Sequence, residues 1–281
     1  MGSSHFDYAD MARGTHQDTH TLHASLVNSI IDIRQTFTLR RFVTAGSHSS
    51  PHHATEAFFE RDNFDVHSRH IVVKDGRQVV ATARLCTREH AEEIGRFYSS
   101  TKFDIGPIIS QTGNLLELSR ISIHPDYQDG TALQSLWQGI TQFCDDKRID
   151  QLIGNVGIPL KYAYTQAVID TLRRHYPAGK HQHVQPRVPL THMQVPQATS
   201  AIMPLLLQSY LQRGARLWGP LTGMPRPTAP SCYSYSGPAN STRHKTATSP
   251  KQKDTPLKLL SADMPYVFAF DQVDHVFAYI A

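Results

Sequence analysis

The chain has 281 residues, of which 40% are hydrophobic and 19% are charged. That apolar content is enough for a full core, so we expect a globular protein with one domain that carries an insertion or tails. The formal net charge of +4 is concentrated between Ser241 and Lys258, where five lysines and arginines stand against one aspartate. We interpret that segment as a solvated loop and expect no nucleic-acid partner, with contact to nucleic acid or phospholipid as the alternative.

The N-terminal part is predicted to hold a tail, helices and a hairpin. Residues 1–22 show no apolar periodicity and are expected to be a disordered tail. From Leu22 to Phe42, apolar residues recur every three to four positions, which is typical of one or two amphipathic helices. A loop rich in serine and histidine follows over Gly46–His53. Arg69–Val73 and Gln78–Leu85 flank an Asp-Gly turn and predict a β-hairpin.

Helices and strands are then predicted in mixed order. The helix that begins at Thr131 has apolar residues at i, i+3, i+4, i+7 and i+10, and so has one buried face. The predicted helices are Ala91–Tyr98, Thr131–Lys147, Tyr162–His175 and Met203–Arg213, and the predicted strands are Leu115–Ile123, Gln151–Val156, Tyr266–Phe270 and Val276–Ile280. This order describes an α+β or mixed α/β domain.

The domain is predicted to cover residues 23–221 and to be completed by strands within residues 263–281. The residues between these two parts, 222–262, are rich in proline, serine, threonine and lysine. That composition indicates a low-complexity insertion.

Several classes of protein are not expected. No apolar run follows a basic start, and Ala201–Leu211 is too short to span a bilayer and contains Pro204. The three cysteines, Cys86, Cys144 and Cys232, have no C-x-x-C spacing, which fits a reducing compartment. We therefore expect a cytoplasmic location.

No metal site is expected, although the chain has 17 histidines. The pairs His52-His53 and His181-Gln182-His183 have no cysteine or glutamate partner at ligand spacing. The chain also has no G-x-S-x-G motif, P-loop or Rossmann fingerprint.

The predicted strand Leu115–Ile123 has an unusual composition. It carries Glu117 and Arg120 within an apolar sequence, and a buried charge costs several kcal/mol, roughly, unless it is paired. This placement suggests a functional site. Residues three apart on a regular strand point to opposite faces, so a shared site for these two residues requires an irregularity in the strand.

Four features together resemble N-acyltransferases that take a fatty acyl group from acyl carrier protein, a branch of the Gcn5-related acetyltransferase (GNAT) fold that includes the acyl-homoserine-lactone synthases. The features are Asp62-Asn63-Phe64-Asp65, Ala83-Arg84-Leu85, Glu117-Leu118-Ser119-Arg120, and His124-Pro125-Asp126-Tyr127 leading into Leu136-Trp137-Gln138-Gly139-Ile140. With Phe97-Tyr98-Ser99 and Phe103-Asp104, they look most like the enzyme that N-acylates ornithine in ornithine-lipid synthesis. The likeness covers residues 30–221 and, more weakly, 266–281.

The resemblance implies a mostly antiparallel central sheet, flanked by helices, with a bulged and splayed central strand. Such a bulge would put Glu117 and Arg120 on one face and turn backbone N–H groups toward a thioester carbonyl. Glu117 would be the general base that deprotonates the acceptor amine. Asp62, Asp65, Arg84 and Arg120 would complete a charged cluster around a zwitterionic amino acid. The alternatives are a Glu117–Arg120 ion pair that only locks the core, and caps or turns formed by the two aspartates.

The resemblance also implies a donor with a phosphopantetheine arm and no resident cofactor. Its binding residues would be Ser122, Ile123, Gln128, Asp129, Gly130 and Thr131, the last four in a turn before a helix N-terminus. The glycine spacing departs from the coenzyme A pattern of this fold and fits a carrier-protein donor, and a plain capping turn is the alternative.

An acyl chain would need apolar walls, and an acidic carrier protein would need a basic surface. The acyl-chain pocket is predicted to be lined by Leu118, Ile121, Trp137 and Ile153, which would also suit an ordinary core. The docking surface is predicted among Arg40, Arg41, Arg173 and Arg174.

We therefore expect a cytoplasmic, membrane-peripheral N-acyltransferase that acts on ornithine or another free amino acid. The family commonly has arginine where Thr38 stands and Asp-His where Arg69-His70 stands, so the acceptor remains open. One alternative is a signal synthase of the acyl-homoserine-lactone type. Another is a non-catalytic scaffold that binds nucleic acid or anionic lipid through the basic insertion.

Overall fold

The computed structural model describes residues 22–45, 59–159, 165–178, 184–187, 203–219, 222–223 and 275–280. Residues 1–21 of the predicted N-terminal tail, the loop Gly46–His53, nearly all of the insertion and the predicted strand Tyr266–Phe270 lie outside the described residues. Within the described residues, no helix has the length and apolarity needed to cross a membrane.

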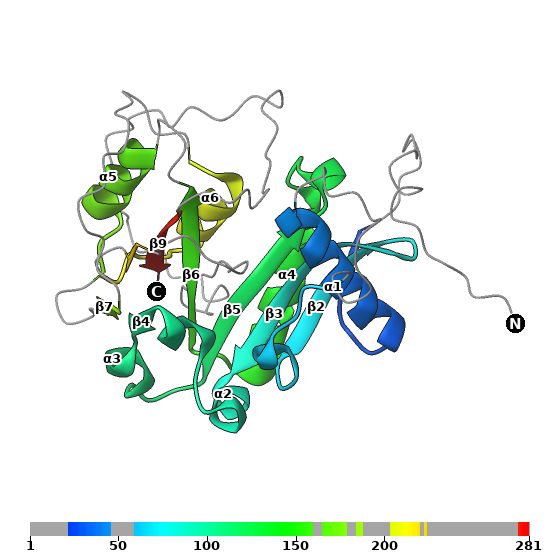
Figure 1. The fold of residues 1–281 in the computed structure, drawn as a ribbon, viewed down its shortest axis with the longest axis horizontal. Coiled ribbons are helices and arrows are strands. Elements are labelled where there is room, and N and C mark those ends of the chain that lie inside the picture. The colour runs from blue at the N-terminus through cyan, green and yellow to red at the C-terminus, as the bar shows by residue number, and fades with distance from the viewer. Residues whose placement is uncertain are drawn as a thin grey trace, which may run out of the picture.

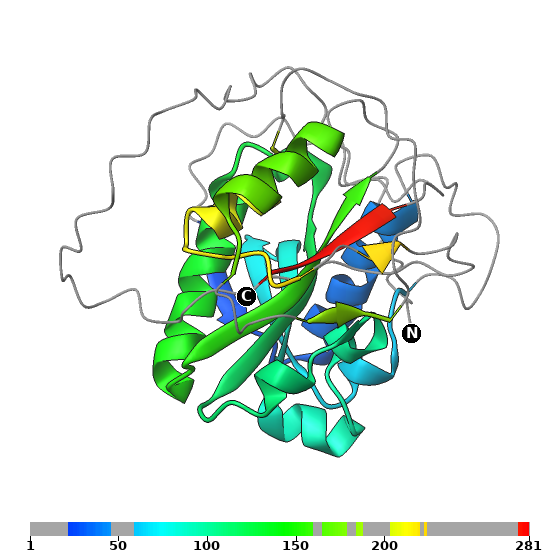
Figure 2. The same ribbon diagram turned by 90° about the vertical axis from the view of Figure 1, so that its left-hand side faces the viewer.

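The fold is built on one mixed sheet with the strand order β1-β2-β3-β5-β6-β9-β8. Its strands are β1 (His23–Leu26), β2 (Arg69–Asp75), β3 (Gln78–Thr87), β5 (Leu115–Ile123), β6 (Gln151–Pro159), β8 (Thr222–Gly223) and β9 (His275–Ile280). All neighbours are antiparallel except β5 and β6, which are parallel. The C-terminal strand β9 lies along β6, as Figure 2 shows in red. The predicted α+β class with a mostly antiparallel sheet is confirmed.

Helices cover both faces of the sheet (Figure 1). On one face, α1 (Ile30–Ala45) packs Leu39 and Val43 against Val72 and Val79 of the hairpin. On the other face, α4 (Thr131–Lys147) joins a large apolar cluster with α5 (Thr165–His175) and α6 (Leu205–Leu211). Shorter elements are η2 (Asn63–Asp65), α2 (Arg88–Ile94), η3 (Tyr98–Thr101), α3 (Gly106–Ile109) and η4 (Pro125–Tyr127), and a second small sheet pairs β4 (Phe103–Asp104) with β7 (Gln185–Pro186).

Two predicted elements are wrong in part. His23–Leu26 is a strand rather than the start of a helix, because it pairs with β2 at the sheet edge. The helix predicted at Ala91–Tyr98 instead covers Arg88–Ile94. The Thr87 hydroxyl caps its start, and Gly95 ends it with a φ of 86°. The strand Leu115–Ile123 and the helix from Thr131 to Lys147 are confirmed.

The central strand β5 is bulged and splayed. Thr82 of β3 is paired with Ser122 and Arg84 with Ser119, so two residues of β5 lie opposite one residue of β3. The inserted residue is Arg120, whose φ is 55°. Beyond Glu117, β5 no longer pairs with β6, which pairs with β9 instead. The predicted bulge and splay are therefore confirmed, and Figure 1 shows β5 and β6 diverging.

Candidate active site

The bulge gathers the charged side chains of β5 on one face of the sheet. Leu118 and Ile121 join the apolar cluster of α4, whereas Ser119 and Arg120 bind charged residues on the opposite face. Because the bulge adds one residue between Glu117 and Ile121, the strand alternation shifts after Ser119. This shift removes the geometric objection to a common site for Glu117 and Arg120.

Three arginines and three carboxylates form a buried network beside this strand. Arg84 Nη1 donates to Asp62 Oδ1 at 2.5 Å and to Asp65 Oδ1 at 3.1 Å, and Arg84 Nε donates to Ser119 Oγ at 2.9 Å. Arg120 Nη2 donates to Asp62 Oδ2 at 2.5 Å, and its Nη1 pairs with Glu60. Arg40 Nη1 donates to Asp65 Oδ1 at 2.7 Å. The three arginines therefore tie α1, β3 and β5 to one acidic segment, 60–65.

Asp62 and Asp65 are both caps and members of the charged network. Asp62 accepts the N–H of Phe64 at 2.9 Å, and the carboxylate of Asp65 accepts the N–H of Asp62 at 2.7 Å, which makes a reciprocal capping box at η2. Burial opposes ionisation of Asp65, but Arg40 and Arg84 hold its pKa far below the usual range. The capping and network interpretations of the two aspartates therefore both hold.

Glu117 is fully buried and is held by the backbone of η3. Its Oε2 accepts the N–H of Tyr98 at 2.7 Å, and its Oε1 accepts the N–H of Ser99 at 2.6 Å. Burial raises the pKa of Glu117, although the hydrogen bonds from Ser99 and Tyr98 act in the opposite direction. The predicted alternative of a Glu117–Arg120 ion pair is not what the structure shows, since Arg120 pairs with Glu60 and Asp62.

Asn155 of β6 also contacts the turn η3 that holds Glu117. Asn155 is fully buried, and its Nδ2 donates to Ser99 Oγ at 3.2 Å. Ser99 thus connects the carboxylate of Glu117 on β5 with the amide of Asn155 on β6. The two diverging strands are bridged at the point where they separate.

Sequence reasoning missed several members of the site. Glu60, Tyr98, Lys102 and Asn155 were not selected. The partners of Glu60 and Asn155 come from segments far away in the chain, and Tyr98 and Lys102 are buried only by the tertiary fold. Lys102 Nζ lies 2.6 Å from Tyr98 Oη, and both side chains are buried. Burial lowers the pKa of Lys102 to about 7 and raises the pKa of Tyr98 to about 12.

The prediction that Arg40 lies on a docking surface is wrong. Its side chain is fully buried against Asp65, and its Nη2 lies 3.0 Å from His70 Nδ1. A guanidinium in that position cannot contact a partner protein. Arg173 and Arg174, in contrast, are exposed at the end of α5.

The predicted donor residues follow one another along the chain from the end of β5 to the start of α4. Ser122 and Ile123 are buried in the last part of β5. Asp129 Oδ1 accepts both the N–H of Thr131 at 3.0 Å and its hydroxyl at 2.7 Å, and Gly130 has a φ of 96°. Gln128 ends η4 just before this turn. These hydrogen bonds between Asp129 and Thr131 form a turn just before α4, whose N-cap Gly130 has no side-chain cap, and the donor role of these residues stays a prediction.

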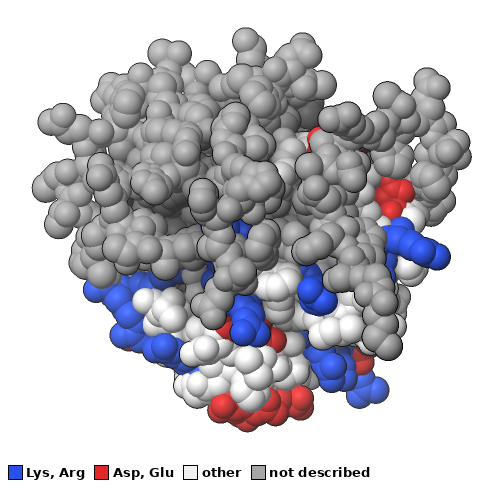
Figure 3. Space-filling view, turned by 45° about the vertical axis from the view of Figure 1, so that its right-hand side comes forward, with Lys and Arg blue, Asp and Glu red and all other residues white. Residues whose placement is uncertain are grey.

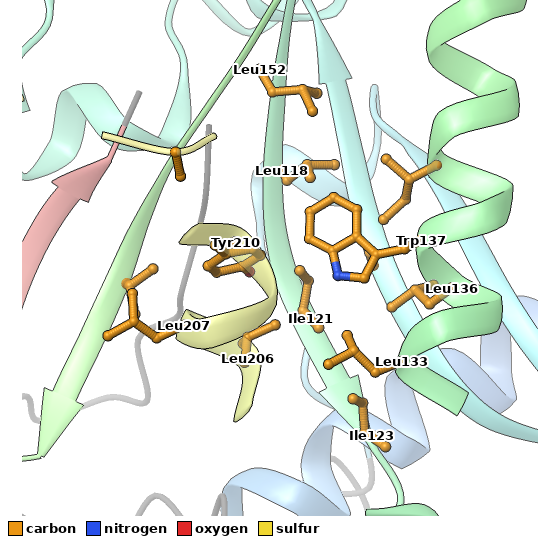
Figure 4. Close-up of a cluster of buried hydrophobic side chains, with 14 of the residues drawn as sticks. Leu118, Ile121, Ile123, Leu133, Leu136, Trp137, Leu152, Leu206, Leu207 and Tyr210 are labelled. Atoms are coloured by element: carbon orange, nitrogen blue, oxygen red, sulfur yellow. The ribbon is translucent and has the colours of Figure 1, made fainter. Parts of the chain in front are cut away.

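Three of the four predicted acyl-pocket residues lie together. Leu118, Ile121 and Trp137 belong to one apolar cluster, in which Trp137 Nε1 donates to Ser209 Oγ at 3.1 Å and its ring meets Tyr210 edge-on at 5.4 Å (Figure 4). Ile153 belongs to a different cluster, with Phe97 and Phe103 among others. The structure therefore does not bring Ile153 to the other three. Among the described residues, no group of histidine, cysteine and carboxylate side chains could hold a metal ion.

The mostly antiparallel sheet, the bulged and splayed β5 and the flanking helices are the features that the sequence resemblance implied. Residues 39–138 match the family model described as an acetyltransferase (GNAT) domain. Residues 39–138 are thus similar to the family that the sequence resemblance indicated.

Parts of the chain are also similar to relatives of known name. The chain is similar to the L-ornithine N(alpha)-acyltransferase of Rhodobacter capsulatus, with 35% identity over 102 residues that cover 34% of this chain and 39% of that protein. It is also similar to the protein of the same name from Brucella abortus, with 31% identity over 145 residues that cover 48% of this chain and 52% of that protein. The chain thus spans about half or less of the length of these relatives. A solved structure titled as the AHL synthase LasI aligns with a TM-score of 0.39 and 10% identity, and covers 63% of this chain and 85% of that one.

Proposed function

We propose that this protein is an N-acyltransferase that moves a long-chain fatty acyl group from acyl carrier protein to the α-amine of an amino acid, with ornithine as the first candidate. The observation that carries the proposal is the buried network of Arg40, Arg84 and Arg120 with segment 60–65 beside the bulge of a GNAT domain. The names of the similar proteins support ornithine as the acceptor.

The network suits a zwitterionic acceptor. The side chain of Asp62 is 24% exposed, whereas those of Arg84 and Asp65 are 0% and 3% exposed, so an ammonium group would approach over Asp62. Arg84 Nη2 and Arg120 Nε are buried and have no hydrogen-bond partner among the described residues. The α-carboxylate of the acceptor would supply the missing acceptors for these N–H groups.

The chemistry is attack of a neutral amine on a thioester. Glu117 would take the proton that the nitrogen sheds as the C–N bond forms, and would return it to the thiolate as the C–S bond breaks. Its raised pKa makes the carboxylate a better proton acceptor than a solvated glutamate. The bulge at Arg120 releases backbone groups from the sheet ladder, and these would polarise the thioester carbonyl.

The acyl chain would lie on the apolar face of β5. Leu118, Ile121 and Trp137 line this face, and Figure 4 shows Tyr210, Leu206 and Leu207 of α6 between β5 and β6. These α6 side chains would move aside or line the acyl chain. The phosphopantetheine arm would reach the thioester past Ser122 and the turn at Gly130.

An acidic carrier protein would dock near α5 rather than near α2. Arg173, Arg174 and Arg216 are exposed, and Leu217 N donates to Tyr176 O, which places the last of these arginines beside the end of α5. α2 instead carries the exposed carboxylates Glu89, Glu92 and Glu93. Figure 3 shows acidic side chains gathered at the lower edge, where Figure 1 places α2. Like charges would repel the carrier there.

The proposal also includes a cytoplasmic location with peripheral membrane contact, because the product would be an amphiphile.

The test incubates the full chain with long-chain acyl carrier protein or acyl-coenzyme A and a panel of amines, followed by mass spectrometry of amide products. We expect N-acylornithine, or another N-acyl amino acid, from the carrier-protein donor. Loss of product in Glu117→Gln, with product retained when residues 222–262 are deleted, would support an enzyme. Binding of nucleic acid or anionic lipid that is lost on this deletion and unchanged in Glu117→Gln, without any amide product, would support a binding scaffold. Product from S-adenosylmethionine would indicate a signal synthase, and absence of any amide would overturn the proposal.

A further inference from the structure

The pair Tyr98–Lys102 is a buried polar unit at the edge of the charged network. Lys102 Nζ lies 2.6 Å from Tyr98 Oη and 4.1 Å from the centre of the Tyr98 ring. The backbone on both sides is fixed, since Lys102 N donates to Ser99 O at 3.0 Å and Lys102 O accepts from Arg187 N at 2.8 Å. The amine is therefore positioned rather than freely moving.

Tyr98 also lies near the two arginines that hold Asp62, the residue over which the acceptor is proposed to approach. Its ring lies 5.4 Å from the Arg84 guanidinium and 5.7 Å from that of Arg120. These are the two guanidinium groups that hold Asp62, whose side chain is the open member of the network. An ammonium group bound at Asp62 would therefore be close to the Tyr98 side chain.

The surroundings of Lys102 favour its neutral form. Burial lowers the pKa of Lys102 to about 7; Arg120 and Arg84 act in the same direction, and Glu117 and Asp62 act against it. The charged and titratable groups around it are Tyr98 on its own turn, Arg84 on β3, Glu117 and Arg120 on β5, Asp62 before η2, and Arg187 beside β7. A neutral amine accepts a proton, whereas an ordinary lysine at neutral pH cannot.

Glu117 alone does not cover all the proton transfers of the proposed reaction. An acceptor that arrives as an ammonium must lose one proton before it attacks and a second as the amide forms. Only one of these protons is taken up by the leaving thiolate. Both carboxylate oxygens of Glu117 already accept backbone N–H groups of the turn that carries Tyr98 and Lys102.

We propose that Tyr98 and Lys102 form a proton route that converts the bound ammonium into the attacking amine, an inference that rests on the proposed function. The ammonium gives a proton to Tyr98 Oη while the Tyr98 hydroxyl proton moves to Lys102 Nζ. The products are a neutral amine, a neutral tyrosine and a lysine ammonium, and Lys102 later releases its proton to solvent. Tyr98 is the catalytic residue of this route, and Lys102 is a positioning residue that acts through it.

The test compares pH–rate profiles of the full chain with acyl carrier protein and the acceptor that gives product. The variants are Lys102→Arg, which stays charged, Lys102→Met, which cannot accept a proton, and Tyr98→Phe, which keeps the ring against Phe64. We expect kcat of the wild type to fall about tenfold per pH unit below neutral pH, and all three variants to lose this inflection along with at least about tenfold in kcat. The matched control is Lys74→Arg, whose residue pairs with Asp32 on another part of the sheet and whose profile should be unchanged.

A second measurement does not depend on activity. The side-chain nitrogen signal of Lys102, assigned by its loss in Lys102→Arg, should titrate near pH 7 in a nuclear magnetic resonance experiment on protein with labelled lysine. An active wild type together with a Lys102→Arg variant that keeps the wild-type inflection would overturn the proton route alone. A parallel loss of rate at every pH would show a merely structural role and would also overturn it. A wild type that forms no amide with any donor would overturn the proposed function itself.

Discussion

Arg40 Nη1 lies 2.7 Å from Asp65 Oδ1, and the two side chains are 0% and 3% exposed. Asp65 also accepts from Arg84, so one carboxylate joins α1 to the hairpin strand β3. His70 also contacts Arg40, because its Nδ1 lies 3.0 Å from Arg40 Nη2. Burial and the Arg40 charge lower the pKa of His70 to about 4, so the imidazole is neutral and can accept from the guanidinium.

Asp65→Asn should destabilise the protein strongly, because it removes one partner from a buried set of charges. We expect a loss of about 3–5 kcal/mol in the free energy of unfolding, measured by urea denaturation. The matched control is Glu93→Gln, which breaks the exposed pair with His67 and should change stability by less than about 0.5 kcal/mol. Equal effects of the two substitutions would contradict the buried network.

The same carboxylate should make stability depend on pH in acid. Arg40 and Arg84 lower the pKa of Asp65 in the folded state, so its contribution is complete above the unfolded value of about 4 and is lost as pH falls below that value. The free energy of unfolding should therefore decrease on acidification below about pH 4, and less steeply in Asp65→Asn. The measurement is a series of urea titrations at decreasing pH, and equal slopes for the two proteins would refute this assignment.

Glu117→Gln should lower kcat by about 10²-fold or more if the carboxylate takes the amine proton. The substitution also places an amide NH₂ against the N–H groups of Tyr98 and Ser99, so some loss of stability should accompany it. Thermal unfolding separates the two effects, since activity is measured well below the lowered midpoint. Glu89→Gln, at an exposed position on α2, is the control and should leave both quantities unchanged.

The fold was largely predictable where local patterns and turn residues agree. The hairpin around Gly76 and the helix from Thr131 have such signals, and both are found. The strand at His23–Leu26 was not predictable, because Leu22, Leu26 and Ile30 repeat with a helical period. Its hydrogen bonds come from β2, about 50 residues away in the chain, and this long-range pairing overrides the local pattern.

The site was predictable only in part. Asp62, Asp65, Arg84, Glu117 and Arg120 were selected through the order of motifs, and the structure does gather them. The bulge was predicted only from the resemblance to a known fold. The residue type at position 120 does not indicate a positive φ, because arginine rarely adopts one. Lys102 was missed because a lysine ahead of a short strand normally reaches solvent, and its burial arises only when η3 folds onto β5.

The left-handed backbone of Arg120 gives a direct test of the bulge. Arg120→Gly and Arg120→Ala both remove the guanidinium, but only glycine adopts a φ of 55° without strain. We expect the glycine variant to be more stable than the alanine variant by about 1 kcal/mol in urea denaturation. The same pair of substitutions at Arg69, an exposed β2 residue, should show the opposite order, because glycine weakens a regular strand.

Gly139 should not tolerate even a methyl group, despite its place inside α4. A Cβ at this position would lie 2.6 Å from Ile71 Cδ1 and 2.7 Å from Ala24 Cβ, so the helix packs closely on β1 and β2 there. Helix propensity alone predicts that Gly139→Ala gains about 1 kcal/mol, whereas overpacking predicts a loss of about 1–3 kcal/mol. We expect the loss to prevail, because Ala24 Cβ is fixed to the backbone of a strand.

Gln138→Ala, at the exposed neighbouring position, is the control and should stay within about 0.5 kcal/mol of the wild type. A stabilised Gly139→Ala variant would show that β1 does not pack against α4 as the structure has it.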